Sequence, residues 1–353
     1  MAIGFFWTSV LFGVFAAVMA LDVMGVFRKK NQFPVDGRTV LITGGSQGMG
    51  KAAAKLLARK GANVIIVARN PQKLEAAVED ITAAAANPQK QRFHHISADL
   101  TDPKESPRII EEATVWNHNT PPDVVWCIAG TSQPGLFVET PIERLRSQME
   151  SNYWSAAYLA HATLKSWLAP SDSKSKTSVP RHLIFTSSVV AFYPIAGYSG
   201  YSEAKSALRT LSDTLSQEIQ LYNGARHHSS SSGPAADVKV HTVFPGTIFS
   251  PGYEQENLTK PAITKELEEG DGGQTEDECA AASVKGLEKG QYMITVAMLG
   301  SAMRSSAWGG SPRNSWLIDP IFSWVTSIAM LFVRWDMDKK VWKWGRANGL
   351  PGK

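Results

Sequence analysis

Short apolar runs alternate with stretches of helical periodicity between residue 37 and about residue 249. Many runs are rich in β-branched residues, and we expect strands at residues 39–42, 63–67, 94–97, 124–128, 182–186 and 238–243. Helices are expected between them, for example over residues 51–59 and 73–86. Strands that are buried on both faces appear as continuous apolar runs. The pattern therefore predicts an α/β fold with a doubly wound parallel sheet.

An uncharged apolar run from Ala2 to about Leu21 precedes this alternating pattern. About 20 such residues can span a bilayer as a helix. Arg28, Lys29 and Lys30 follow the run, whereas a cleavable signal peptide carries its positive charge before the apolar part. We therefore expect residues 1–30 to be a transmembrane anchor with a basic flank, and the positive-inside rule places the chain after it in the cytosol. A cleaved targeting peptide is the alternative.

The last part of the chain differs from the alternating region. A short apolar stretch covers residues 293–303, and a longer one at residues 316–333 is interrupted by Asp319 and Pro320. Neither is a clean spanning helix, so we expect residues 291–353 to associate with the membrane at its interface or as a re-entrant hairpin. Buried soluble helices are the alternative. The α/β domain then occupies residues 37–290.

Two polar inserts interrupt this domain, at residues 171–180 and 224–236. The first is rich in serine and lysine, and the second contains His227, His228 and four consecutive serines. Each lies between an expected helix and the next strand, where surface loops are tolerated. The histidine pair could ligate a metal, but we expect a solvated loop.

The formal charge of the 353-residue chain is +4, and its basic clusters flank the two apolar regions. Anionic membrane lipids are therefore more suitable partners than nucleic acid. The chain has only two cysteines, Cys127 and Cys279, which support neither a disulfide framework nor a zinc motif. We expect a cytosol-facing domain without a metal site.

A glycine-rich segment follows the first expected strand and opens the first helix. It contains Gly44, Ser46, Gln47, Gly48 and Gly50, in the spacing T-G-x-x-x-G-x-G. Glycine lets a pyrophosphate approach the backbone closely, and a helix N-terminus offers free N–H groups to phosphates. The segment therefore predicts the dinucleotide site of a Rossmann fold, with these five residues as contacts. A plain turn is the alternative.

The second expected strand ends in Ala68-Arg69-Asn70. A site for NAD usually has an acidic residue there, which bonds the ribose 2′-hydroxyl. Arg69 can instead pair with a 2′-phosphate, so we expect NADPH rather than NADH as the cofactor. Lys73 is a second candidate for this contact, although both side chains could simply be solvated.

Tyr201 and Lys205 are four residues apart, so their side chains share one face of a helix. A nearby ammonium favours the phenolate, and we expect Lys205 to lower the pKa of Tyr201 from its usual value near 10. Tyr201 would then be a proton donor near neutral pH. Ser188 follows the strand at residues 182–186, at the sheet edge where ligands bind, and is expected to hydrogen-bond a substrate carbonyl.

Asn152 lies within an expected helix, where asparagine is unfavourable. We expect it to bend that helix and to hold a water that relays protons to Lys205. Ser187 is the alternative to Ser188, but we expect its side chain to point into the fold.

The phosphate loop, Asn152, Ser188, Tyr201 and Lys205 occur in this order, and together they resemble the short-chain dehydrogenase/reductase family. The resemblance covers about residues 37–251 and implies a Rossmann-fold oxidoreductase. It also implies that these four residues are catalytic, with Lys205 bonding the nicotinamide ribose.

The same resemblance assigns further cofactor contacts and one departure. Asp99 matches the family's aspartate that contacts adenine, with Leu100 beside it, and Pro245 matches the proline after the sixth strand. The family's N-N-A-G segment is C-I-A-G in this chain, at residues 127–130. The departure concerns a contact that stabilises the fold and leaves the catalytic groups intact.

More narrowly, the phosphate loop, the Ala68-Arg69-Asn70 turn and the segment at residues 245–252 are similar to those of the 3-ketodihydrosphingosine reductase subfamily. This similarity implies reduction of a long-chain amino-ketone lipid in sphingolipid synthesis, at the endoplasmic reticulum membrane with the catalytic domain facing the cytosol. The wider family implies a possible homodimer. A steroid, retinoid or fatty-acyl ketone is the alternative substrate, and a non-catalytic cofactor-binding scaffold is the remote alternative.

The polar segment at residues 247–270 is expected to close over the substrate. It is acidic, and its carboxylates could attract a substrate ammonium. A solvated acidic loop is the simpler interpretation.

Overall fold

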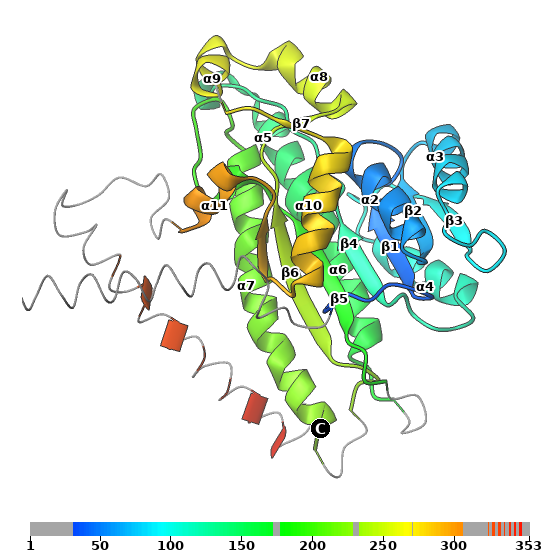
Figure 1. Cartoon of the computed structure of the whole chain (residues 1–353). Helices are drawn as coiled ribbons and strands as arrows, with labels where there is room; N and C mark the ends of the chain where they lie inside the picture. The colour runs from blue at the N-terminus through cyan, green and yellow to red at the C-terminus, as the bar shows by residue number, and fades with distance from the viewer. Residues whose placement is uncertain are drawn as a thin grey trace, which may run out of the picture.

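The computed structural model describes residues 31–171, 177–228, 233–269 and 271–305, together with separate positions between residues 324 and 347. Its main sheet has seven parallel strands in the order β3-β2-β1-β4-β5-β6-β9, as Figure 1 shows. The strands are β1 (Thr39–Thr43), β2 (Asn63–Ala68), β3 (Phe93–Ser97), β4 (Val124–Cys127), β5 (Arg181–Thr186), β6 (Val238–Phe244) and β9 (Met293–Thr295). The strand order reverses between β1 and β4, and a ligand crevice is expected there at the carboxyl ends.

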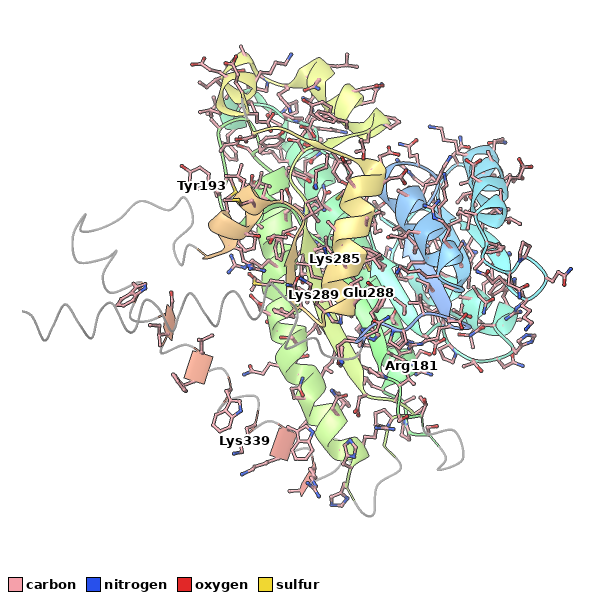
Figure 2. All side chains as sticks on the ribbon, in the orientation of Figure 1. Arg181, Tyr193, Lys285, Glu288, Lys289 and Lys339 are labelled. Carbon is pink, nitrogen blue, oxygen red and sulfur yellow. The ribbon has the colours of Figure 1, made fainter. Side chains whose placement is uncertain are left out.

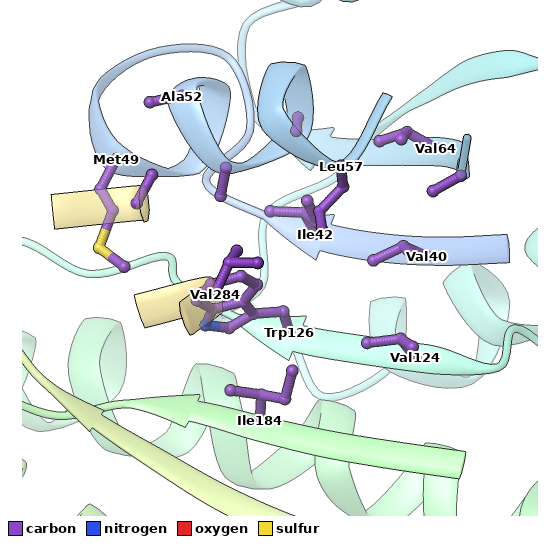
Figure 3. Close-up of a cluster of buried hydrophobic side chains, with 14 of the residues drawn as sticks. Val40, Ile42, Met49, Ala52, Leu57, Val64, Val124, Trp126, Ile184 and Val284 are labelled. Atoms are coloured by element: carbon purple, nitrogen blue, oxygen red, sulfur yellow. The ribbon is translucent and has the colours of Figure 1, made fainter. Parts of the chain in front are cut away.

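Helices cover both faces of the sheet (Figure 1). One layer contains α2 (Gly48–Arg59), α3 (Pro71–Ala83) and α10 (Glu276–Glu288), and the other contains α4 (Glu105–Trp116), α6 (Ser155–Trp167) and α7 (Tyr201–Arg226). Figure 3 shows the first layer, where Ile42 of β1, Trp126 of β4 and Val284 of α10 lie in one buried cluster. The next residue of β1, Leu41, belongs to the opposite cluster. The strands are apolar throughout because each of their faces is buried.

Smaller elements lie above the carboxyl edge of the sheet. The first are a 3₁₀ turn (η1, Phe137–Glu139) and α5 (Ile142–Met149), which continues through a π-helical turn (η2, Glu150–Trp154) into α6, and a second 3₁₀ turn (η4, Val189–Ala191) follows β5. After β6 come β7 (Ile248–Phe249), α8 (Pro251–Thr259), α9 (Ala262–Leu267) and β8 (Gln274–Thr275), in which β7 pairs with β8. The helix α11 (Met298–Ser305) follows β9. Figure 1 shows α8 and α9 at the top of the molecule and α11 beside α7.

The structure confirms the doubly wound sheet and all six expected strands, and it extends the domain at both ends. Phe33 and Val35 are buried in the core, before the expected start at residue 37. At the other end, β9 pairs with β6 as a further strand, beyond the expected boundary at residue 290. Residues 293–295 are thus part of the sheet, although their sequence predicted membrane association.

The two inserts also have different bounds from those expected. Helix α7 runs to Arg226, so the second insert begins later than residue 224. Helix α3 starts two residues earlier and ends three residues earlier than the helix predicted at residues 73–86. The inner parts of both inserts, residues 172–176 and 229–232, lie outside the described residues.

The expected anchor at residues 1–30 lies outside the described residues, as does most of the chain after residue 305. Within the described ranges, no helix has the length and apolar character needed to cross a membrane.

Candidate active site

The glycine-rich loop connects β1 to α2 at the strand-order reversal. Gly44 and Gly48 have positive φ angles, +67° and +62°, which favour glycine. A Cβ atom on Gly50 would lie 2.2 Å from the carbonyl oxygen of Gly44, so this position accepts no larger residue without a shift. Helix α2 has no side-chain cap and no acidic residue in its first turn. Its free N–H groups and glycine cradle fit a pyrophosphate.

The residues expected around the adenosine ribose lie at the ends of β2 and β3. Arg69 is exposed directly after β2. Lys73 Nζ donates a 3.0 Å hydrogen bond to Gln47 Oε1, which places this lysine at the phosphate loop. Asp99 Oδ1 accepts hydrogen bonds from the Thr101 amide (3.1 Å) and hydroxyl (2.8 Å). The bond from the amide lowers the pKa of Asp99, and the charge of Arg69 adds to the effect.

Asn152 lies in the π-helical turn, at a fully buried position. Its Nδ2 donates to the carbonyl oxygens of Thr131 (2.8 Å) and Gln148 (2.9 Å), and its Oδ1 accepts from the Thr131 amide (3.1 Å). The Asn152 side chain therefore hydrogen-bonds the backbone of Thr131, outside the helix, and the carbonyl of Gln148, one turn before it. This agrees with the expected helix irregularity, since π turns of this kind are frequent at functional sites.

Ser188 and Tyr201 meet in front of β5. Ser188 Oγ is 3.3 Å from the carbonyl oxygen of Pro245 and is hydrogen-bonded to the Tyr201 hydroxyl. Burial raises the pKa of Tyr201, and the charge of Glu256 raises it further, while the bond to Ser188 opposes both. The expectation of a lowered pKa is therefore wrong, because burial and the charge of Glu256 raise the pKa and Lys205 is not among the groups that shift it.

Lys205 lies one turn after Tyr201 in α7 and is buried. Its Nζ donates to the carbonyl oxygen of Thr186 (2.9 Å) and lies 5.6 Å from the centroid of the Tyr201 ring. Burial lowers the pKa of Lys205 to about 8. The neighbouring Ser187 is buried and donates to the carbonyl oxygen of Lys205 (2.8 Å), so it points into the fold as expected.

A buried ion-pair cluster covers Tyr201 from the α8–α9 side. Lys260, whose side chain is 1% exposed, has its Nζ 2.8 Å from Glu256 and 2.5 Å from Glu268. The Tyr198 hydroxyl lies 2.5 Å from a carboxylate oxygen of each glutamate, and its ring centroid is 5.8 Å from that of Tyr201. Burial lowers the pKa of Lys260, but its two carboxylate partners outweigh this and raise it. These carboxylates are therefore paired rather than solvated.

Apart from Asn152 and Lys260, these groups line one cleft of about 1780 Å³ at the carboxyl edge of the sheet. Every cofactor-contact residue expected from the sequence lines it, as do Ser188, Tyr201 and Lys205. Asn152 lies behind the wall. A Cβ atom on Gly130 would be 2.6 Å from Asn152 Oδ1 and 3.2 Å from Lys205 Nζ, so only a glycine separates the two side chains.

Comparison with known proteins shows the family to which the chain is related. A family model described as short chain dehydrogenase matches residues 38–259. The chain belongs to this short-chain dehydrogenase family. It is 57% identical to a 3-ketodihydrosphingosine reductase of Aspergillus fumigatus, over 92% of this chain and 89% of that protein. It is 44% identical to a protein of the same name from Neurospora crassa, over 98% of this chain and 92% of that protein.

The solved structures of the family agree with the fold. A short-chain dehydrogenase/reductase from Burkholderia phymatum, crystallised in complex with NAD, superposes with a TM-score of 0.64 at 16% identity. The match covers 78% of this chain and 94% of that one. At this identity the likeness establishes the fold alone.

Sequence reasoning missed the ion-pair cluster. Its members come from the loop before α7, from α8, from the α8–α9 link and from the end of α9, so no single stretch contains the pattern. The spacing of four residues between Glu256 and Lys260 was the available signal.

His227 Nε2 lies 3.6 Å from Asp237, and the described residues contain no group of three or more His, Cys, Asp or Glu that could hold a metal ion.

Proposed function

We propose that this protein reduces the 3-keto group of 3-ketodihydrosphingosine to dihydrosphingosine, with NADPH as the hydride donor. The observation that carries the reaction type is the meeting of Ser188, Tyr201 and Lys205 in the cleft that also contains the glycine loop. The substrate is that named for relatives of 44–57% identity, which align over nearly the whole chain.

The cofactor is held by groups that fit its parts. The glycine cradle from Gly44 to Gly50 binds the pyrophosphate, Asp99 and Leu100 border the adenine, and Arg69 pairs with the 2′-phosphate. Lys73 supports the phosphate end. Bound NADPH supplies the hydride.

The residues around the ketone supply orientation and the proton. Ser188 donates a hydrogen bond that orients the carbonyl oxygen, and Tyr201 gives its proton to that oxygen. Tyr201 is protonated at neutral pH, as a phenol ordinarily is. Burial raises its pKa and so makes release of the proton harder, which is why the phenolate that forms needs the nearby ammonium. Lys205 stabilises the phenolate that forms and bonds the ribose. Asn152, next to Lys205 behind Gly130, holds the water that restores the proton.

Charge in the cleft favours an amino-ketone over a steroid ketone. Glu256 and Glu268 share one cation, Lys260, which leaves one negative charge beside Tyr201. This charge is complementary to the ammonium that a sphingoid ketone carries next to its carbonyl.

We further propose that residues 1–30 anchor the protein in the endoplasmic reticulum membrane, with the catalytic domain in the cytosol. The apolar run from Ala2 to Leu21 supports this. Apolar side chains among the described C-terminal positions are exposed, namely those of Trp324, Ile328, Leu331, Phe332 and Trp335. Their spacing of three to four residues forms one helical stripe, which suits contact of the segment around residues 324–335 with membrane lipids.

A homodimer through the helices around Asn152 and Lys205 is part of the same proposal. Trp154, in the π-helical turn beside Asn152, is 40% exposed, and Ile142 of α5 is also exposed. Large apolar side chains of this kind are enriched at interfaces between subunits.

The decisive assay follows the loss of nicotinamide absorbance with detergent-solubilised full-length protein and 3-ketodihydrosphingosine. NADPH and NADH are compared, and a steroid ketone is run in parallel. We expect turnover with the sphingoid ketone and NADPH. Turnover of the steroid alone would refute the lipid substrate while leaving the catalytic residues in place.

The role of Tyr201 is tested with Tyr201→Phe. Removing the acid should lower kcat by about 10²–10⁴-fold, while the affinity for NADPH, read from nicotinamide fluorescence, stays within a few fold. Tyr222→Phe, in the same helix but outside the cleft, is the control and should keep full activity. Substantial turnover by Tyr201→Phe would refute the proposed acid.

A further inference from the structure

Helix α11 is held firmly against the sheet edge next to the reacting groups. Arg304 Nη1 donates to the carbonyl oxygen of Met293 (2.8 Å), and the hydroxyls of Thr295 and Ser301 are 2.7 Å apart. A Cβ atom on Gly300 would lie 3.1 Å from a methyl group of Val189, so the helix packs closely on the η4 turn. Since Val189 follows Ser188 directly, α11 borders the ketone site.

One face of α11 lines the cleft with apolar side chains. Leu299 and Met303, which are one helical turn apart, are both part of the cleft wall. Leu299 is nevertheless 44% exposed, so it lies where the cleft opens to solvent. Met298 is 90% exposed and is not part of the wall. Helix α11 therefore has one apolar face that lines the cleft and a second face, with Met298, that is exposed to solvent.

The other side of the opening is apolar as well. Leu258 of α8 and Leu267 of α9 line the same cleft and are also exposed. Tyr193 lies between the η4 turn and α7, and Figure 2 shows it near α11 at the edge of the molecule. The exposed part of the cleft wall thus has apolar side chains from both α11 and the α8–α9 segment, although α8 also places the exposed polar residues Glu254 and Gln255 there.

We propose that α11, together with Leu258 and Leu267 opposite it, forms the binding subsite for the hydrocarbon chain of the ketone substrate. This inference rests on the proposed function and names the part of the same cleft that selects a long unbranched chain. The ketone lies at Ser188 and Tyr201, and the chain leaves past Val189 between Leu299 and Leu258. Exposed leucines that continue a catalytic cleft would be covered by such a chain.

A chain-length series tests the subsite directly. Amino-ketones with chains of 6 to 18 carbons are assayed with NADPH below their micelle-forming concentrations. Burial of each added methylene should raise kcat/KM of the wild type by about fourfold until the subsite is filled. Leu299→Asn should lower the ratio of long-chain to short-chain kcat/KM by at least about tenfold. Leu258→Asn, on the opposite wall, should have the same effect.

Met298→Gln is the matched control, because it changes a neighbouring residue on the outer face of the same helix. It should leave the chain-length ratio unchanged. The subsite is overturned if the wild type shows no chain-length dependence, if Leu299→Asn and Leu258→Asn slow all chain lengths equally, or if Met298→Gln matches Leu299→Asn. A wild type that reduces no amino-ketone of any length instead refutes the proposed function itself.

Discussion

Burial has opposite consequences for Tyr201 and Lys205, although they are neighbours on one helical turn. It raises the pKa of the phenol and lowers that of the ammonium to about 8, because the charged form is disfavoured in both. Before cofactor binds, the first group to lose its proton as pH rises is therefore Lys205. Deprotonation of the Lys205 ammonium, rather than of the Tyr201 phenol, therefore sets the highest pH at which the free enzyme keeps its active protonation state.

This predicts the pH profile of kcat/KM for NADPH, which reports the ionisation of the free enzyme. The value should fall as pH rises through about 8, because Lys205 then loses the charge that bonds the ribose and stabilises the phenolate. Initial rates from pH 6 to 10 give this midpoint. Lys205→Arg should lower the overall rate and remove the decline near pH 8, since arginine keeps its charge. A midpoint unchanged in Lys205→Arg would assign the decline to another group.

At this scale the sequence was informative wherever the chemistry is local. The glycine loop and the Tyr201–Lys205 pair could be predicted because each lies within one short segment, and the structure places all of them in one cleft. The direction of the Tyr201 pKa could not be predicted. It depends on how deeply the phenol is buried and on Glu256, which lies 55 positions further along the chain.

Among the elements, the pair α8 and α9 depends on a single lysine. Lys260 lies in the link between the two helices, and its carboxylate partners come from one helix and from the end of the other. Tyr198 connects the same carboxylates to the start of α7. The ion-pair cluster thus connects α8 and α9, which cover the cleft, to the start of α7, the helix that carries Tyr201.

We therefore expect Lys260→Met to loosen the α8–α9 cover. Two carboxylates would be left close together without a cation, which should lower the free energy of unfolding by about 3 kcal/mol. Denaturant unfolding measures this loss, and limited proteolysis should cut first between residues 251 and 269. Lys265→Met, at an exposed position in α9, should change neither result. Unchanged stability in Lys260→Met would show that the ion pairs contribute no net stabilisation.

Element types were predictable where periodicity extends over a full strand or helix. The strand β9 was not, because three residues are too few to show a period and the stretch at 293–303 is apolar as a whole. What makes residues 293–295 a strand is the free edge of β6, a feature of the assembled sheet rather than of the segment. The end of α7 was missed because its last turn contains Gly224, which disfavours a helix interior, although Gly224 and Ala225 are buried within the helix.

At the scale of the whole molecule, a buried histidine pair joins distant parts of the domain. His182 Nδ1 of β5 lies 2.9 Å from His241 Nε2 of β6, and His241 Nδ1 is 2.7 Å from the carbonyl oxygen of Gln291, just before β9. The ring of Phe33 packs edge-on against His182. The carbonyl can only accept, so His241 donates to it through Nδ1. Since burial lowers the pKa of both histidines, both rings are neutral at neutral pH, and His241 Nε2 then accepts from His182 Nδ1.

The pair makes the fold sensitive to acid. Burial lowers the pKa of His241 from 6.5 to about 4. Burial, the partner His241 and the charges of Arg38 and Lys239 lower that of His182 as well. Between pH 6.5 and about 4 the unfolded chain binds protons that the folded chain does not, so stability is complete above pH 6.5 and falls as pH decreases. The loss from His241 alone is on the order of 3 kcal/mol.

Unfolding free energies measured by denaturant titration from pH 7.5 to 4.5 test this dependence. His241→Gln keeps a neutral donor for the Gln291 carbonyl and cannot take up a proton, so its stability should fall less steeply than that of the wild type, while His182 keeps its own contribution to the slope. His161→Gln changes an exposed histidine of α6 and should reproduce the wild-type slope. If His241→Gln follows the wild-type slope instead, the acid sensitivity belongs to His182 or to the carboxylates and not to His241.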